Sequence, residues 1–387
     1  ATAQVTANNV SAFVADSGTS STGTVIINSA SGGSTITMTN ATSGTFTING
    51  GSSGDIITGG GDNDVIDGNG SDDDITGGGG DDNLTGGAGN DTFRVDSGSD
   101  TIVDLGGTAG GDSDVLIVSS GATATISNVK SFTAGGTTAN NSGTVEITTH
   151  TDGGTINMSS ASGNFTLNGQ GSVDTLTGGS GNDTVVGGGG ADSLSGGTGD
   201  DDISGGADND EMTGGAGADT FKVDAGTDTV KDLGGSSGGE TDILIVSNGA
   251  TANATDITSF TASSSTKNEG TANLTVKVAG GTIDIGNSTT GAYSLTGLSG
   301  NDTLKGNGNA DTIIGGNGDD TIDGRGGNDI INAGGGDDII TVSSAGQGDG
   351  DTIDGGSGTD TLSLSNGSHS FATDAKLQNI NSINLAS

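Results

Sequence analysis

Aspartates recur at a strict spacing of nine residues in three parts of the chain, which span residues 50–94, 169–222 and 297–341. These nonapeptide blocks hold five, six and five copies, and all sixteen copies have Asp at the sixth place and an apolar residue at the eighth. Short carboxylates at regular spacing are suited to ligating hard divalent cations. The block aspartates are Asp55, Asp64, Asp73, Asp82, Asp91, Asp174, Asp183, Asp192, Asp201, Asp210, Asp219, Asp302, Asp311, Asp320, Asp329 and Asp338.

The composition favours a cation-neutralised repeat protein over a conventional globular domain. The 387 residues include 80 glycines, no proline and no cysteine, and only 28% are hydrophobic. A repeat array needs only a thin core, because each repeat covers its neighbours. The formal net charge of −40 argues against nucleic acid or anionic lipid as a partner. No apolar stretch reaches the length of a membrane-spanning helix, so we expect no membrane insertion.

The nonapeptides follow the pattern GGxGxDxUx, in which U is apolar, as in residues 59–67 (GGGDNDVID) and 86–94 (GGAGNDTFR). With this pattern the sequence resembles the RTX (repeats-in-toxin) family of calcium-binding repeats. Sixteen copies in unbroken register, 144 of 387 residues, make the resemblance specific. It implies an all-β fold, a parallel β-roll or β-solenoid with Ca²⁺ bound in its turns.

Each nonapeptide divides into a six-residue turn and a three-residue strand. Glycine at places 1, 2 and 4 permits positive φ and close backbone approach. The apolar eighth residue points inward, because successive strand side chains alternate between faces; in the first block these residues are Ile57, Ile66, Ile75, Leu84 and Phe93. Two nonapeptides complete one coil of eighteen residues, so we expect equivalent aspartates to stack at about 4.8 Å. Such a column of carboxylates is repulsive unless cations lie between its members.

The resemblance also implies ligand sets, in which backbone carbonyls of two stacked turns join the two sixth-place aspartates. Transferred to this sequence, Gly60, Asp62 and Asp64 pair with Gly77, Gly79 and Asp82. Likewise Gly179, Gly181 and Asp183 pair with Gly196, Thr198 and Asp201. Pairing each repeat with the next but one gives three, four and three sites in the blocks, so we expect at least about ten calcium ions. The simpler alternative is that Asp only suits the turn, but it does not explain why Asn and Ser are excluded from all sixteen copies.

Further aspartates follow each block where the turns gain or lose residues, and two interpretations stay open for them: calcium ligation or turn formation alone. They are Asp100, Asp114, Asp228, Asp242, Asp351 and Asp360.

Three long copies of one design make up the chain, with expected boundaries at residues 1–119, 120–247 and 248–387. The segment 43–50 (SGTFTING) recurs at 162–169 (SGNFTLNG), and Phe13, Phe132 and Phe260 mark another shared position. Residues 23–49, 143–168 and 270–296 alternate Val, Ile and Thr with polar residues and are poorer in aspartate, which predicts metal-free coils of the same solenoid. Both ends of the chain resemble one element, exemplified by residues 125–132. We therefore expect either a fragment of a longer array or a unit that self-associates end to end or in a lattice.

No catalytic motif is recognisable, so we expect no enzymatic activity. His150 and His369 occupy non-equivalent positions and suit loop or strand surfaces, while Met38, Met158 and Met212 suit the core. The leading hypothesis is an extracellular structural protein that resembles RTX-containing bacterial surface-layer or filament proteins and is exported by type I secretion. The alternative is the repeat or stalk region of a large adhesin whose binding or catalytic domain lies outside this sequence.

Overall fold

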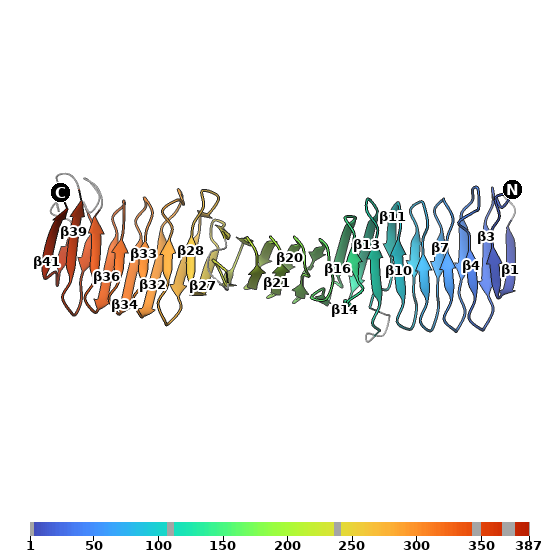
Figure 1. Cartoon of the computed structure of the whole chain (residues 1–387), viewed down its shortest axis with the longest axis horizontal. Coiled ribbons are helices and arrows are strands. Elements are labelled where there is room, and N and C mark those ends of the chain that lie inside the picture. The colour runs from blue at the N-terminus through green and yellow to red at the C-terminus, as the bar shows by residue number, and fades with distance from the viewer. Residues whose placement is uncertain (1–3, 107–111, 236–240, 343–349, 366–375, 387) are drawn as a thin grey trace. The chain divides into compact units, whose positions relative to one another are not determined.

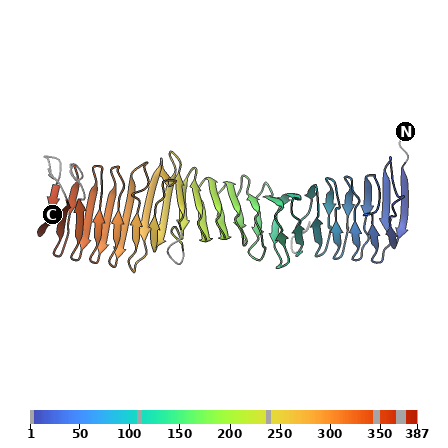
Figure 2. The ribbon, with the colours of Figure 1, turned by 45° about the horizontal axis from the view of Figure 1, so that its top comes forward.

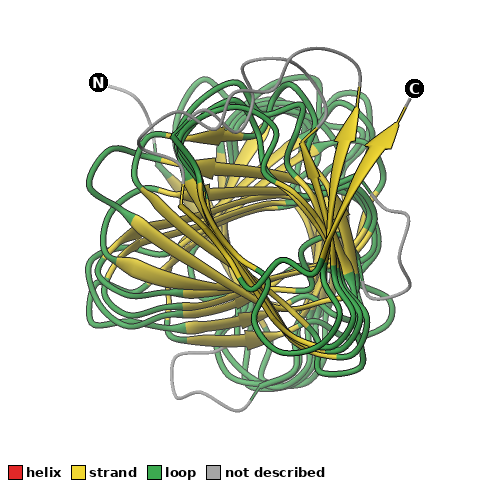
Figure 3. Cartoon of the chain, turned by 90° about the vertical axis from the view of Figure 1, so that its left-hand side faces the viewer, coloured by secondary structure: helices red, strands yellow, loops and turns green. Residues whose placement is uncertain are grey.

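A computed structural model describes residues 4–106, 112–235, 241–342, 350–365 and 376–386. All regular elements in these residues are β-strands, joined by loops at the corners of successive coils (Figure 3). The chain divides into two compact halves, Ala1–Gly188 and Gly189–Ser387, and each is described by itself. The fold is the expected parallel β-solenoid, whereas the three predicted unit boundaries stay predictions.

In the N-terminal half, drawn from blue to green in Figures 1 and 2, successive strands alternate between the walls of the coil. All strand pairings within this half are parallel. The first wall contains β1 (Val5–Val10), β3 (Val25–Ser29), β5 (Phe46–Asn49), β7 (Val65–Asp67), β9 (Asn83–Thr85), β11 (Ser99–Ile102), β13 (Thr123–Val129), β16 (Thr144–Thr149), β18 (Thr166–Asn168) and β20 (Thr184–Gly189). Other strands are β2 (Ala12–Val14), β4 (Thr35–Thr37), β6 (Ile56–Thr58), β8 (Asp74–Thr76), β10 (Thr92–Val95), β12 (Val115–Val118) and β15 (Ala139–Asn140), followed by β14 (Ser131–Thr133), β17 (Thr155–Asn157) and β19 (Thr175–Thr177).

The C-terminal half repeats this alternation with parallel pairing throughout its described strands. One sheet contains β21 (Ser193–Thr198), β23 (Glu211–Ala216), β25 (Thr227–Lys231), β27 (Thr251–Ile257), β30 (Thr271–Val276), β32 (Tyr293–Ser299), β34 (Thr312–Asn317), β36 (Ile330–Gly335), β38 (Thr352–Asp354) and β40 (Lys376–Gln378). The others are β22 (Asp202–Ala207), β24 (Thr220–Val223), β26 (Ile243–Val246) and β29 (Lys267–Asn268), and then β28 (Ser259–Thr261), β31 (Thr282–Asp284), β33 (Thr303–Lys305), β35 (Thr321–Asp323), β37 (Ile339–Val342), β39 (Thr361–Ser365) and β41 (Ser382–Ala386).

The register within the blocks confirms the coil of eighteen residues. Ile57 lies opposite Ile75, and Ile75 lies opposite Phe93. On the other wall Ile66 lies opposite Leu84. These eighth-place side chains are fully buried, because two facing strands of each coil point them into the same interior. Met38, Met158 and Met212 are also buried in the core, as expected.

The segments between the blocks continue the same parallel pairing with slightly longer coils. Ile26 lies opposite Thr47, a step of 21 residues. Here asparagine side chains form the ladder between coils: Asn49 Nδ2 donates to Asn28 Oδ1 at 2.7 Å, and Asn28 Nδ2 donates to Asn8 Oδ1 at 2.6 Å. An amide is both donor and acceptor, so it can stack on itself without a cation. His150 accepts the Asp152 N–H at its Nδ1 atom in a loop, and His369 lies outside the described residues.

Candidate metal centres

The block aspartates form columns that are buried inside the turns. All sixteen are at most 3% exposed. In each column a backbone N–H of one aspartate donates to Oδ1 of the aspartate one coil later: Asp55 to Asp73 at 2.6 Å, Asp73 to Asp91 at 2.8 Å and Asp64 to Asp82 at 2.7 Å. Equivalent aspartates therefore stack as the repeat pattern predicts, and each carboxylate has one oxygen fixed by the backbone.

The second carboxylate oxygen has no partner in many of these turns. Buried Oδ2 atoms without any hydrogen-bond partner belong to Asp73, Asp82, Asp100, Asp210, Asp228, Asp302, Asp320, Asp329, Asp338 and Asp360. Burying an unpaired carboxylate oxygen costs several kcal/mol. A divalent cation is the group that would satisfy these oxygens, so the residues fit calcium at this position.

Glycines bring these oxygens close to the backbone. A Cβ atom on Gly77, at place 1, would overlap Asp82 Oδ2 and would lie 2.9 Å from Asp100 Oδ2. Both oxygens therefore converge on one small space beside Gly77. Gly77 has no positive φ, so glycine serves there by permitting close approach, whereas the last repeat of the third block has Ala333 at the same place. Positive φ occurs at places 2 and 4, for example 102° at Gly78 and 103° at Gly80.

Burial makes the metal-free carboxylates poor acids. The pKa of Asp73 is raised to about 7: desolvation is the largest cause, the hydrogen bond from the Asp55 N–H lowers the pKa, and the charges of Asp91 and Asp55 raise it. The pKa of Asp100 is raised to about 7 and that of Asp329 to about 8, with burial as the largest cause in both cases. Two unscreened charges about 5 Å apart repel by roughly 3 kcal/mol at an effective dielectric constant of 20. A bound cation would remove both penalties.

The structure brings together part of the predicted ligand set. The turns of Asp64 and Asp82 stack, and the Gly79 N–H donates to the Gly60 carbonyl oxygen at 2.9 Å. Asp62 lies at the surface, where its Oδ2 accepts the Gly44 N–H at 2.8 Å. The set of Gly179, Gly181 and Asp183 with Gly196, Thr198 and Asp201 draws on both halves and stays a prediction. Among the described residues no three acidic or histidine side chains cluster around one point, so a site must combine two carboxylates with backbone carbonyls.

The aspartates after the blocks differ in the contacts of their carboxylate oxygens. Asp100, Asp228 and Asp360 continue their columns, and each has a buried Oδ2 without a partner. Asp114 and Asp242 instead accept an additional backbone N–H at Oδ2, from Gly106 at 2.7 Å and from Gly234 at 2.6 Å. Asp351 accepts the Asp329 N–H at 2.8 Å.

Two further groups of polar residues were not anticipated from the sequence. Fifth-place residues form a second ladder outside the first: Asn63 Oδ1 accepts the Asp81 N–H at 2.9 Å, and Asp81 Oδ1 accepts the Ser99 N–H at 3.0 Å. The enrichment of Asn and Asp at place 5 is the signal that could have revealed it. Asp104 and Asp232 each accept two N–H groups from the last turn of a block, and both occur in a shared DLGG motif.

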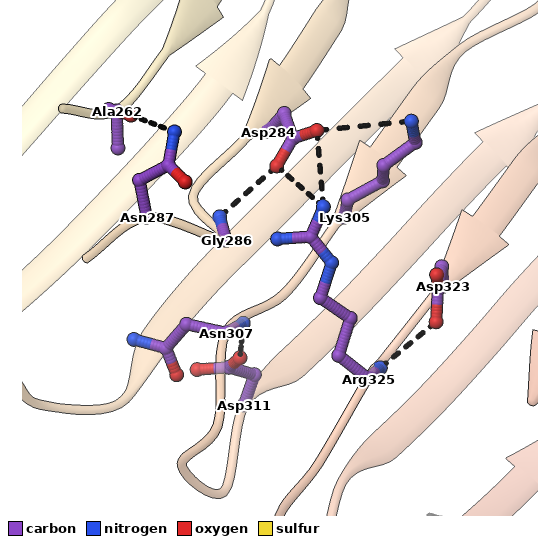
Figure 4. Close-up of polar contacts among 9 residues, drawn as sticks. All are labelled: Ala262, Asp284, Gly286, Asn287, Lys305, Asn307, Asp311, Asp323 and Arg325. Atoms are coloured by element: carbon purple, nitrogen blue, oxygen red, sulfur yellow. Dashed lines mark hydrogen bonds and ion pairs between the residues drawn. The ribbon is translucent and has the colours of Figure 1, made fainter. Parts of the chain in front are cut away.

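A charged latch crosses three coils at the start of the third block (Figure 4). The Arg325 guanidinium contacts the Asp284 carboxylate at 3.0 Å, and Lys305 Nζ lies 3.7 Å from the same carboxylate. Gly286 leaves room for the arginine, since a Cβ there would coincide with the guanidinium. The first long copy has Thr37, Thr58 and Gly78 at the matched positions, so it lacks this charged contact.

Replacing Asp284 by Asn is expected to lower the free energy of unfolding of the calcium-loaded chain by about 1 kcal/mol, because two cations lose a partly buried partner. The control is Asp202→Asn, which breaks the more exposed Lys222–Asp202 pair and should cost at most a few tenths of a kcal/mol. Denaturant unfolding at saturating calcium measures the effect of both variants. Equal effects of the two variants would contradict the role of the latch.

These features define a class: a parallel β-solenoid whose acidic turns are built to take cations. The family model of the RTX calcium-binding nonapeptide repeat matches residues 47–75, 67–102, 168–203, 195–230, 289–322, 305–340 and 345–368. The chain belongs to this family of calcium-binding repeats. No curated protein matches the chain. In the described residues, no helix is both long and apolar enough to span a membrane.

Proposed function

We propose that this protein is an extracellular structural protein, a subunit of a bacterial surface layer or filament, which folds on calcium after type I secretion. The carrying observation is the set of buried, unpartnered aspartate oxygens in the columns. Where calcium is scarce, these carboxylates repel one another and keep the chain open. Millimolar calcium outside the cell binds the folded form alone and so stabilises it by mass action.

A structural role rather than catalysis is proposed because the polar groups of the turns serve contacts between coils. Self-association is supported by the terminal coils among the described strands. β1 and β2 are edge strands of their sheets in the N-terminal half, and β40 and β41 are edge strands in the C-terminal half. Val5, Val14, Ile383 and Leu385 are more than half exposed there. Exposed apolar edge strands recruit further strands, so copies could add end to end.

Electron microscopy of the purified chain tests this function. Ordered lattices or fibres in calcium, which disperse in chelator, are the expected result. The second candidate, the stalk of a large adhesin, rests on the same repeats and predicts separate rods in calcium at every protein concentration. Dispersed rods would therefore overturn the assembly proposal and leave calcium binding intact.

A further inference from the structure

The turns of the blocks are of two kinds, which differ in the second oxygen of the aspartate. In closed turns, Oδ2 accepts the N–H of the second-place residue of its own repeat. Gly51 donates to Asp55 at 2.6 Å, Gly60 to Asp64 at 2.6 Å, and Asn307 to Asp311 at 2.8 Å. Gln170 and Gly179 donate in the same way to Asp174 and Asp183. Both carboxylate oxygens are then satisfied by the protein itself.

In open turns the second-place residue has positive φ and makes no such bond. The corresponding φ angles are 71° at Asn69, 102° at Gly78, 114° at Gly316 and 112° at Gly334. Their aspartates, Asp73, Asp82, Asp320 and Asp338, have buried Oδ2 atoms without a partner. The change of φ turns the second-place N–H away from the carboxylate and leaves the oxygen free for another ligand.

The closed turns lie where a column begins. Each block starts two columns, so six aspartates are each the first in a column and occupy what we call leading turns. They are Asp55, Asp64, Asp174, Asp183, Asp302 and Asp311. All but Asp302 are in closed turns, and the exception has Leu298 at place 2 with φ of 123°. In a closed leading turn Oδ1 also accepts an N–H from the metal-free coil before it, as Asp64 does from Phe46 at 2.7 Å and Asp311 from Tyr293 at 2.8 Å.

At the C-terminal ends of two columns, backbone N–H groups also satisfy the second carboxylate oxygen of the last aspartate. Asp114 and Asp242 accept the N–H groups of Gly106 and Gly234 at Oδ2. In the turn before Asp114, Asp104 accepts the second-place N–H of Gly87 at 2.7 Å. In the third block the latch of Arg325 and Asp284 spans the closed turn of Asp311 (Figure 4). The boundaries with metal-free coils are thus held by donors of the chain itself.

We propose that calcium occupies only the open turns of each column, and that the closed leading turns bind no calcium and instead join the calcium-binding stack to the metal-free coils. This inference rests on the calcium binding in the proposed function and specifies which turns perform it. It removes Asp55, Asp64, Asp174, Asp183 and Asp311 from the predicted calcium ligands, although their repeats match the family pattern. Asp302, in its open turn, remains a ligand.

Native mass spectrometry of the full chain at saturating calcium can test this, because it counts bound ions. Asp64→Asn and Asp311→Asn alter closed turns, and Asp82→Asn and Asp329→Asn alter the open turns one coil later in the same columns. The closed-turn variants are expected to keep the ion count of the unmodified chain, while each open-turn variant loses at least one ion. The two pairs lie in separate halves, so misfolding of one variant leaves the other pair decisive.

Equal losses in the closed-turn and open-turn variants would overturn the inference. An unmodified chain that binds no calcium would overturn both this inference and the proposed function. Full calcium binding with the expected pattern of losses, but without assembly in the microscope, would overturn the structural role alone.

Discussion

Removal of calcium at pH 7.5 is expected to abolish most of the β-sheet signal in far-ultraviolet circular dichroism, and acidification to pH 5 without calcium is expected to restore part of it. The reason is that the folded, metal-free chain holds aspartates with raised pKa, about 7 for Asp73 and Asp100. In the unfolded chain these groups return to their ordinary pKa of about 4.

Between about pH 4 and pH 7 the folded state therefore binds more protons than the unfolded state. Its stability falls as pH rises through this window, and the full penalty is present above about pH 7. Calcium binding has the opposite dependence, because protons compete for the same oxygens. Salt added to the same ionic strength as the calcium solution controls for screening. A metal-free chain that is equally folded at both pH values, or less folded at pH 5, would contradict this explanation.

Substitution of Gly77 by Ala is expected to weaken calcium-dependent folding strongly. The added methyl group would overlap Asp82 Oδ2 and approach Asp100 Oδ2, so it would occupy the space where the two oxygens converge. We expect a cost of about 1–3 kcal/mol, seen as roughly a tenfold or greater rise in the calcium concentration at the folding midpoint.

Gly79→Ala in the same turn is the matched control. Its nearest neighbours would be the Gly61 Cα and Ser97 Oγ atoms at 3.5 Å, an ordinary contact, and its φ is not positive. Calcium titrations followed by circular dichroism compare the two variants with the unmodified chain. Similar midpoints for Gly77→Ala and Gly79→Ala would show that the space beside Gly77 is no calcium site.

The sequence was sufficient to predict the solenoid, its eighteen-residue coil and the stacking of the block aspartates. These follow from periodicity, because eighth-place residues such as Ile75 must share one interior. It did not reveal which turns are open, since that depends on φ at place 2: Gly60 and Gly78 are the same residue in equivalent repeats but differ in φ. For these two turns the preceding coils differ, because Asp64 accepts the N–H of Phe46 whereas Asp82 accepts the N–H of another aspartate, Asp64.

Side-chain contacts between different coils could not be predicted from the sequence for a related reason. Arg325 and Asp284 lie 41 residues apart, and no local pattern links them. Asp104 and Asp232, which each accept two N–H groups from the last turn of a block, lie outside the nonapeptide register, in coils lengthened by insertions. Fifth-place asparagines such as Asn63 were visible in the sequence, but their ladder depends on the stacking of complete turns.

The central claim is that calcium ions lie between stacked interior aspartates and hold the coils together. An anomalous-difference map from crystals of the calcium-loaded chain, measured where calcium scatters anomalously, tests it most directly. We predict peaks beside Gly77, between Asp82 and Asp100, and along the column of Asp320, Asp338 and Asp360. A folded, calcium-saturated chain with no peak in these columns would contradict the claim.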